Sequence, residues 1–165
     1  MDPTQLLKKQ HREVEALFRK VERTESPDDC RRLLGEIQEK LELHMRIEED
    51  IFYPAVKGLE TKKAEEMIHE AYEEHGVVKL VLSRLPEADP EDERFHAKMT
   101  VLSELIEHHV EEEEKEMFKL AQKLGDDELE ALGERMASVA EEHGAEPLAA
   151  GRDGASRRGR HKKAR

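Results

Sequence analysis

The chain has 165 residues, of which 41% are charged, 36% are hydrophobic and only 4% are aromatic, and its formal net charge is −12. The length suits one domain with a single core, and the lack of alternating β-branched runs excludes a sheet protein. The only cysteine, Cys30, excludes an intrachain disulfide and favours a reducing compartment. No apolar run resembles a signal peptide or a membrane span, so we expect a cytoplasmic protein without a membrane partner.

The charge is unevenly distributed along the chain. Residues 152–165 hold seven basic side chains and one acidic side chain, a balance of +6 that leaves −18 for the preceding residues. Such an acidic body repels nucleic acid and anionic lipid. The basic tail is the one segment suited to nucleic acid or an acidic partner, although short Arg/Gly/Ser segments are more often solvated and disordered.

Capping signals divide the chain into five predicted helices. Capping side chains, three of them followed by proline, stand at Asp2-Pro3, Ser26-Pro27, Thr61 and Asp89-Pro90. The predicted helices span residues 3–24, 27–57, 62–85, 91–124 and 126–143, and glycines follow several of their ends. Short connections predict an all-α protein: an antiparallel up-down-up-down four-helix bundle over 1–124, an accessory helix over 125–143 and a basic, disordered tail over 144–165.

Each of the first four predicted helices carries an apolar stripe that a histidine interrupts. The four histidines are His11, His44, His75 and His109, and the second and fourth helices add Glu48 and Glu113 one turn after their histidine. A buried carboxylate without a partner costs several kcal/mol, and two that face each other raise one another's pKa. A metal cation between the carboxylates removes both penalties.

The spacing H-x-x-x-E places both side chains on one helical face, where both reach one metal centre. Imidazole and carboxylate ligands without a thiolate favour iron or manganese over structural zinc. A single histidine on an apolar stripe is usually an ordinary core residue, but four such residues on four helices favour a metal. The E-x-x-H pairs at residues 66–69 and 93–96 lie off the stripes and at opposite helix ends, so we reject them as one site.

Counting residues from the connections tests whether the histidines are level. His44 and His75 lie at the same height along the bundle, whereas the heights of His75 and His109 differ by roughly 12 Å. This mismatch predicts that the fourth helix starts beyond the end of the bundle or that residues 86–92 fold back. His108 lies on a neighbouring line of the helix, so His109 is the preferred ligand.

The order H, H-x-x-x-E, H, H-x-x-x-E resembles the hemerythrin HHE cation-binding family. The segments that carry the resemblance are KQHREVEALF at 9–18, LELHMRIEEDIFYPAV at 41–56, EAYEEHGVVKLVL at 70–82 and LIEHHVEEEEKEMFKLA at 105–121. The resemblance implies two non-haem iron ions joined by an oxo or hydroxo bridge. It makes His11, His44, His75 and His109 terminal ligands, with Glu48 and Glu113 bridging the irons.

One departure from the family bears on function. Oxygen-carrying hemerythrins have a second histidine one turn after the third-helix ligand, where this chain has Lys79, and their second bridging carboxylate lies one residue further from its histidine. By resemblance, two coordination positions then stay open, which suits peroxide turnover or oxygen reduction, including a catalase-like activity. An additional ligand would remove this argument, and the candidates are His108, Glu49, Glu74 and Tyr72.

We therefore expect a di-iron protein that binds or reacts with oxygen or hydrogen peroxide. The alternatives are a non-catalytic iron or oxygen sensor whose partner docks on the basic tail, and a bundle with a purely structural metal. Tyr53 and Tyr72 are either hydrogen-bond donors near the metals or packing residues. The sequence leaves the oligomeric state open.

Overall fold

The computed structural model describes residues 1–144, and every regular element in this part of the chain is helical. The all-α prediction is therefore confirmed. The expected basic tail lies outside the described residues, apart from its first residue. None of the described helices combines the length and apolar character that a membrane crossing needs.

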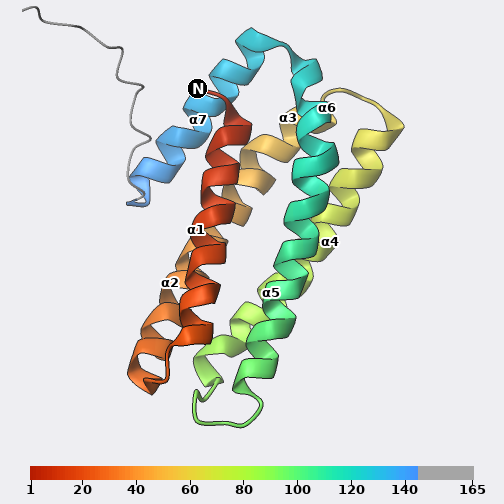
Figure 1. The fold of residues 1–165 in the computed structure, drawn as a ribbon. Helices are drawn as coiled ribbons and strands as arrows, with labels where there is room; N and C mark the ends of the chain where they lie inside the picture. Colours follow the sequence, from red (N-terminus) through yellow and green to blue (C-terminus); the bar gives the residue numbers. More distant parts are fainter. Residues whose placement is uncertain (145–165) are drawn as a thin grey trace, which may run out of the picture.

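Four long helical rods lie alongside one another (Figure 1). The first is α1 (Pro3–Arg23), and the second joins α2 (Pro27–Ile47), the π turn η1 (Glu48–Phe52) and α3 (Tyr53–Lys57). The third is α4 (Lys62–Arg84), followed by the 3-10 turn η2 (Leu85–Glu87). The fourth joins α5 (Phe95–Glu112), the π turn η3 (Glu113–Met117), α6 (Phe118–Ala121) and the 3-10 turn η4 (Gln122–Leu124).

Three of the predicted helix starts are capped as the sequence indicates. The side chains of Asp2, Ser26 and Thr61 each accept a hydrogen bond from a backbone N–H in the first turn of the helix that follows. The fourth prediction, a start at Asp89-Pro90, is wrong, because α5 begins at Phe95. Asp89 and Asp92 instead accept hydrogen bonds from backbone N–H groups two residues on, which forms turns where a helix was expected.

The later start of α5 accounts for much of the level mismatch found in the sequence. It removes four residues between the connection and His109, equivalent to about 6 Å of helix. The turns over residues 88–94 supply the remaining chain between the two rods.

The last described helix, α7 (Asp126–Glu142), packs against α1 and closes one end of the rods. Its apolar face joins the core through Leu129, Leu132, Met136 and Ala140. The N-terminal residues of the chain pass so close to α7 that a Cβ atom on Gly133 would overlap the carbonyl oxygen of Met1.

The apolar interior consists of two clusters with a polar layer between them. On α1, Leu7 belongs to one cluster and Val14 to the other, with His11 between them. On α4, Ala71 and Val78 flank His75 in the same manner. The layer that separates the two apolar clusters is the candidate functional site.

Candidate metal centre

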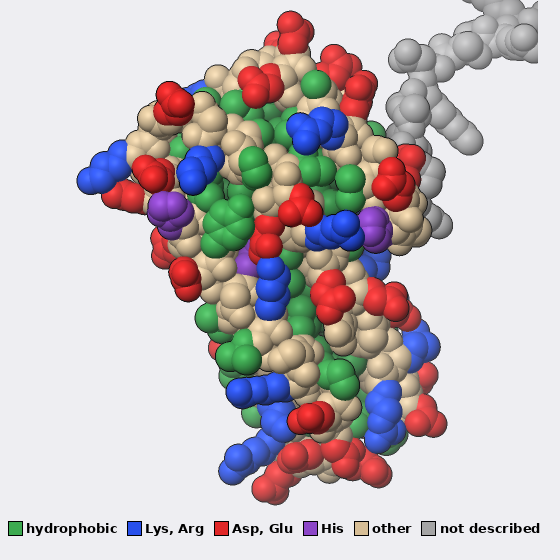
Figure 2. Space-filling model, turned by 180° about the vertical axis from the view of Figure 1, so that it is seen from behind, with side chains coloured by type: hydrophobic (Ala, Val, Ile, Leu, Met, Phe, Trp, Pro, Cys, Tyr) green, Lys and Arg blue, Asp and Glu red, His purple; other side chains and the backbone are tan. Residues whose placement is uncertain are grey.

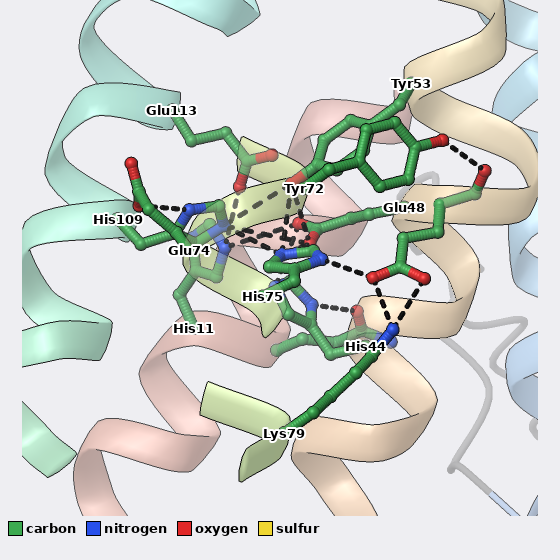
Figure 3. A network of polar contacts seen from close by, with 12 residues as sticks. His11, His44, Glu48, Tyr53, Tyr72, Glu74, His75, Lys79, His109 and Glu113 are labelled. Atoms are coloured by element: carbon green, nitrogen blue, oxygen red, sulfur yellow. Dashed lines mark hydrogen bonds and ion pairs between the residues drawn. The ribbon is translucent and has the colours of Figure 1, made fainter. Parts of the chain in front are cut away.

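The six residues that interrupt the predicted stripes converge on one buried cluster (Figure 3). Even the most accessible of them, His109, is only 7% exposed. The histidines come from four different rods, and the two glutamates each open a π turn. This inner cluster comprises His11, His44, Glu48, His75, His109 and Glu113.

Glu48 lies at the middle of the inner cluster. Its Oε1 is 2.9 Å from Nε2 of His44, and its Oε2 is 3.1 Å from Nε2 of His75. Nε2 of His11 lies 4.0 Å from Oε1, and Nε2 of His109 lies 3.9 Å from Oε2. The two oxygens of this carboxylate therefore face two different pairs of histidines.

The ligand atoms fall into two groups that share Glu48. One group contains His11, His44, Glu48 and Glu113, and the other contains Glu48, His75 and His109. Oε2 of Glu113 lies 3.2 Å from Nε2 of His11, so Glu113 stands with the first group. The resemblance implies that both glutamates bridge, but in this structure Glu48 alone is shared by the two groups.

Several buried polar atoms of the inner cluster have no hydrogen-bond partner among the described residues. Burying such groups is costly, so their convergence points to a ligand that binds nitrogen and oxygen lone pairs. These atoms are Nε2 of His11, Nε2 of His44, Oε1 of Glu48 and both carboxylate oxygens of Glu113. The donor set of imidazole nitrogens and carboxylate oxygens fits a transition-metal ion.

The second group supports the same conclusion through the histidine tautomers. Nε2 of His75 and Nε2 of His109 face each other at 3.1 Å. Their Nδ1 atoms lie 2.8 Å from carboxylate oxygens of Glu49 and Glu74, so in the neutral imidazoles the proton sits on Nδ1. Two nitrogen lone pairs then point at one another, an arrangement that a cation between them stabilises.

Every inner histidine is oriented by an oxygen on its outer side. Each Nδ1 lies 2.8 Å from its acceptor: His11 from Glu114, His44 from Gln10, His75 from Glu49 and His109 from Glu74. Such partners fix the tautomer and the ring orientation of metal-binding histidines. Gln10 and Glu114 were not among the predicted site residues, although each lies directly beside a predicted ligand in the sequence.

Tyr53 reaches the second group. Its hydroxyl donates to Oε2 of Glu48 at 3.2 Å and lies 3.2 Å from Nε2 of His75. The π turn explains this position, because the N–H of Tyr53 bonds to the carbonyl of Glu48 five residues earlier and the helix is one residue wider there. Tyr53 is fully buried, and of the two roles left open for it, the structure places a hydrogen-bond donor here.

The other candidate ligands lie outside the inner cluster. Glu49 and Glu74 bind the outer nitrogens of His75 and His109, and His108 is exposed beside Glu112. Tyr72 is 39% exposed and donates to the backbone carbonyl of Glu49. Lys79 also turns outward and binds both carboxylate oxygens of Glu49 at 2.7 Å.

The pKa values of the cluster reflect burial and mutual charge. Burial and the neighbouring charge of Glu48 raise the pKa of Glu113 to about 7. Burial opposes ionisation of Glu48 as well, but the His44 charge and the histidine nitrogens around the carboxylate hold its pKa well below the usual value. Burial lowers the pKa of His44, whereas the nearby carboxylates of Glu48 and Glu74 overcome burial and raise the pKa of His109 well above its usual value.

Comparisons with known proteins agree with this site. A crystal structure of a Hemerythrin HHE cation binding domain-containing protein from Mycobacterium kansasii superposes with a TM-score of 0.75 at 30% identity, covering 87% of each chain. An uncharacterized protein of Mycobacterium tuberculosis is 29% identical over 151 residues, which are 90% of this chain and 91% of that protein. A DNA nickase of Nostoc sp. is 25% identical over 118 residues, which are 72% of this chain but only 33% of the nickase.

The family assignment rests on most of the chain. The sequence profile of the Hemerythrin HHE cation binding domain matches residues 2–121, a range that includes all six residues of the inner cluster. The chain therefore belongs to the hemerythrin HHE cation-binding domain family.

Proposed function

We propose that this chain holds two iron ions in the inner cluster and binds or reacts with a small oxidant, either oxygen or hydrogen peroxide. We further propose that the four rods form an up-down-up-down bundle and that the protein is cytoplasmic. The observation that carries it is the division of the inner cluster into two groups that share the carboxylate of Glu48. One ion would be held by His11, His44 and Glu113, the other by His75 and His109, with Glu48 between them.

A bound pair of iron ions would supply redox chemistry toward oxygen or peroxide. The residues of this chain would set the conditions for that chemistry. The second group has fewer protein ligands than the first, and the Tyr53 hydroxyl lies 3.2 Å from Nε2 of His75 and 3.4 Å from Nε2 of His109. Tyr53 donates to Glu48, and its own pKa is raised well above the usual value by burial, so it remains a neutral hydrogen-bond donor at neutral pH.

A groove between α1 and α5 offers a small neutral oxidant a path toward His11. The groove has a volume of about 440 Å³, and its lining includes His11 together with Phe18, Ile106 and Val110. Arg12 and Glu114 form an ion pair of 3.0 Å beside His11 at this groove. Charged side chains, Glu15, Glu107, Glu111 and Lys115, also line the groove, and a small uncharged molecule can contact its apolar side chains.

The proposal is tested by loading the full chain anaerobically with ferrous iron, exposing it to air, and measuring iron per chain and the absorption spectrum. We expect two irons per chain with oxo-bridged ferric bands. Glu48→Ala should lose both, because both groups share this carboxylate. Glu39→Ala, an exposed glutamate on the same helix, is the charge-matched control and should load as the wild type does.

The reaction is tested separately from the metal count. Iron-loaded protein should consume hydrogen peroxide or react with oxygen at a rate that the metal-free protein and Glu48→Ala lack. A chain that binds two irons but reacts with neither oxidant would remove the proposed reactivity and leave metal binding in place. One iron or none in the wild-type chain would contradict the proposal as a whole.

A further inference from the structure

A second group of ligand-type side chains lies at the surface between α4 and α5. Glu74 on α4 and His108 and Glu112 on α5 each offer one ligand atom, and these atoms lie within 4.8 Å of one another. The side chains of His108 and Glu112 are 63% and 46% exposed, and that of Glu74 is 20% exposed. One imidazole nitrogen with carboxylate oxygens is a donor set suited to a divalent transition-metal ion.

The space behind this surface group leads inward to a carboxylate of the inner cluster. A cavity of about 20 Å³, large enough for one water-sized ligand, is lined by Glu74, Glu112, His109 and Glu113. Glu113 is 1% exposed, and within residues 1–144 its Oε1 has no hydrogen-bond or ion-pair partner. A buried carboxylate, one of whose oxygens has no partner among the described residues, therefore lines the same small cavity as two members of the surface group.

Glu74 connects the surface group to the inner cluster directly. Its Oε2 binds Nδ1 of His109 at 2.8 Å, so one carboxylate belongs both to the surface group and to the outer side of an inner ligand. A cation on the surface group would thus lie one side chain away from His109 and, across the small cavity, one side chain away from Glu113.

The charge of this opening differs from that of the groove over His11. The groove is lined by two basic residues, Arg12 and Lys115, together with four glutamates, whereas the small cavity is lined by Glu70, Glu74, Glu112 and Glu113 without a lysine or arginine. Acidic side chains also spread along the whole length of the molecule in Figure 2, in keeping with the net charge of −12. A negative field of this kind raises the local concentration of cations.

We infer that Glu74, His108 and Glu112 form a surface site for a divalent cation, and that ferrous iron passes from this site to the inner cluster through Glu113 and His109. The inference rests on the proposed function, because it supplies the metal that the inner cluster is proposed to hold. It assigns the two openings of the bundle to different reactants, a cation at one and a neutral oxidant at the other.

The test measures the rate at which the full chain takes up ferrous iron. The metal-free protein is mixed anaerobically with ferrous iron, uptake is stopped with a chelator at set times, and iron per chain is measured. The double variant His108→Ala/Glu112→Gln should reach the same final iron count as the wild type, several-fold more slowly. The control His69→Ala/Glu73→Gln removes the same residue types at the same spacing from exposed positions on α4 and should load at the wild-type rate.

Equal loading rates in the wild type and both double variants would overturn the inference. A zinc titration of the metal-free chain gives a second measurement that does not depend on iron uptake. A zinc equivalent beyond those that the inner cluster binds, lost in His108→Ala/Glu112→Gln and kept in the control, supports the surface site, and a wild-type chain without this additional equivalent overturns the site. A wild-type chain that takes up no iron defeats the proposed function and the delivery role together, while the zinc titration still decides the surface site.

Discussion

Tyr53 and Phe118 occupy equivalent positions in the two halves of the metal centre. Each follows a cluster glutamate by five residues, and its N–H bonds to that glutamate's carbonyl across a π turn. The ring of Tyr53 lies 5.4 Å from that of His75, and the ring of Phe118 stacks parallel to that of His11 at 6.1 Å. The same local geometry therefore places a hydroxyl beside one metal group and a plain phenyl ring beside the other.

The correspondence extends to the outer partners of the histidines. The residue after each cluster glutamate, Glu49 or Glu114, binds the single histidine of another rod. The residue before each single histidine binds the histidine of an H-x-x-x-E pair, but it is Gln10 in one half and Glu74 in the other. The two metal groups consequently differ in charge as well as in the hydroxyl.

Replacing Tyr53 with phenylalanine removes a buried hydrogen-bond donor to Glu48. The free energy of unfolding of the metal-free protein should fall by about 1 kcal/mol, the typical net value of such a bond. Urea unfolding of Tyr53→Phe measures this loss. Tyr72→Phe is the matched control, because Tyr72 donates at an exposed position and its loss should change stability little; equal effects of the two substitutions would contradict the prediction.

Replacing Gln10 with alanine removes the acceptor that orients His44. Metal affinity of the group that contains His11 and His44 should fall by about 10–100-fold, the usual effect of losing such a partner. Competition with a chelator of known affinity measures the change. Gln38→Ala removes a glutamine that bonds only to Glu42 on an exposed face, and it should leave the affinity unaltered. An affinity loss of the same size in Gln38→Ala would show that the effect is unrelated to His44.

The metal-free protein should lose stability as the pH rises from about 6 to about 8. Folding raises the pKa of Glu113, His109 and His11, so in this window the folded state binds more protons than the unfolded state. Stability from these groups is present at lower pH and is lost as the pH rises through their folded-state pKa values. His44, whose pKa is lowered by burial, acts in the opposite direction but is a single group.

The substitution Glu113→Gln isolates one contribution to this pH dependence. It removes a buried carboxylate that repels Glu48, so the metal-free variant should melt at a higher temperature than the wild type at about pH 8 and show a shallower loss of stability with pH. Thermal melts at several pH values measure both effects. An unchanged slope would mean that Glu113 does not titrate in this range.

Gly133 should not tolerate a side chain, because a Cβ atom there would overlap the backbone of Met1. Gly133→Ala should lower the free energy of unfolding by about 1–3 kcal/mol, the usual cost of overpacking. At Gly35, which is also inside a helix but has nothing within 4 Å of a Cβ, alanine should raise it by about 0.5–1 kcal/mol. Denaturant unfolding of both variants tests this prediction, because the two changes in the free energy of unfolding should have opposite signs.

The sequence predicts the helices and the inner cluster for the same physical reason. A buried helical face must be apolar, so each polar residue on a stripe stands out, and all six such residues meet in the structure. Helix ends were predictable where one capping bond decides them, as at Ser26 and Thr61. The start at Asp89 was not, because its side chain also stabilises a turn, and sequence alone does not weigh the two.

The two π turns and the residues that they place could not be predicted from the apolar stripes. A constant helical period places the residue four positions after Glu48 on the cluster side, whereas the wider turn brings Tyr53 there. The partners of the outer nitrogens were hidden for a different reason. Gln10 and Glu114 lie at half-exposed positions of their helices, where polar residues are common and do not indicate a site.

The polar layer that divides the apolar interior has a further consequence, for the lifetime of the chain in a cell. The apolar interior is divided into two clusters instead of forming one continuous core. A ligand that binds the layer only in the folded state would add to the folding free energy by mass action. If the layer binds metal as proposed, a chain without its ligands would open more often and be degraded sooner, and proteolysis would then favour the loaded molecules.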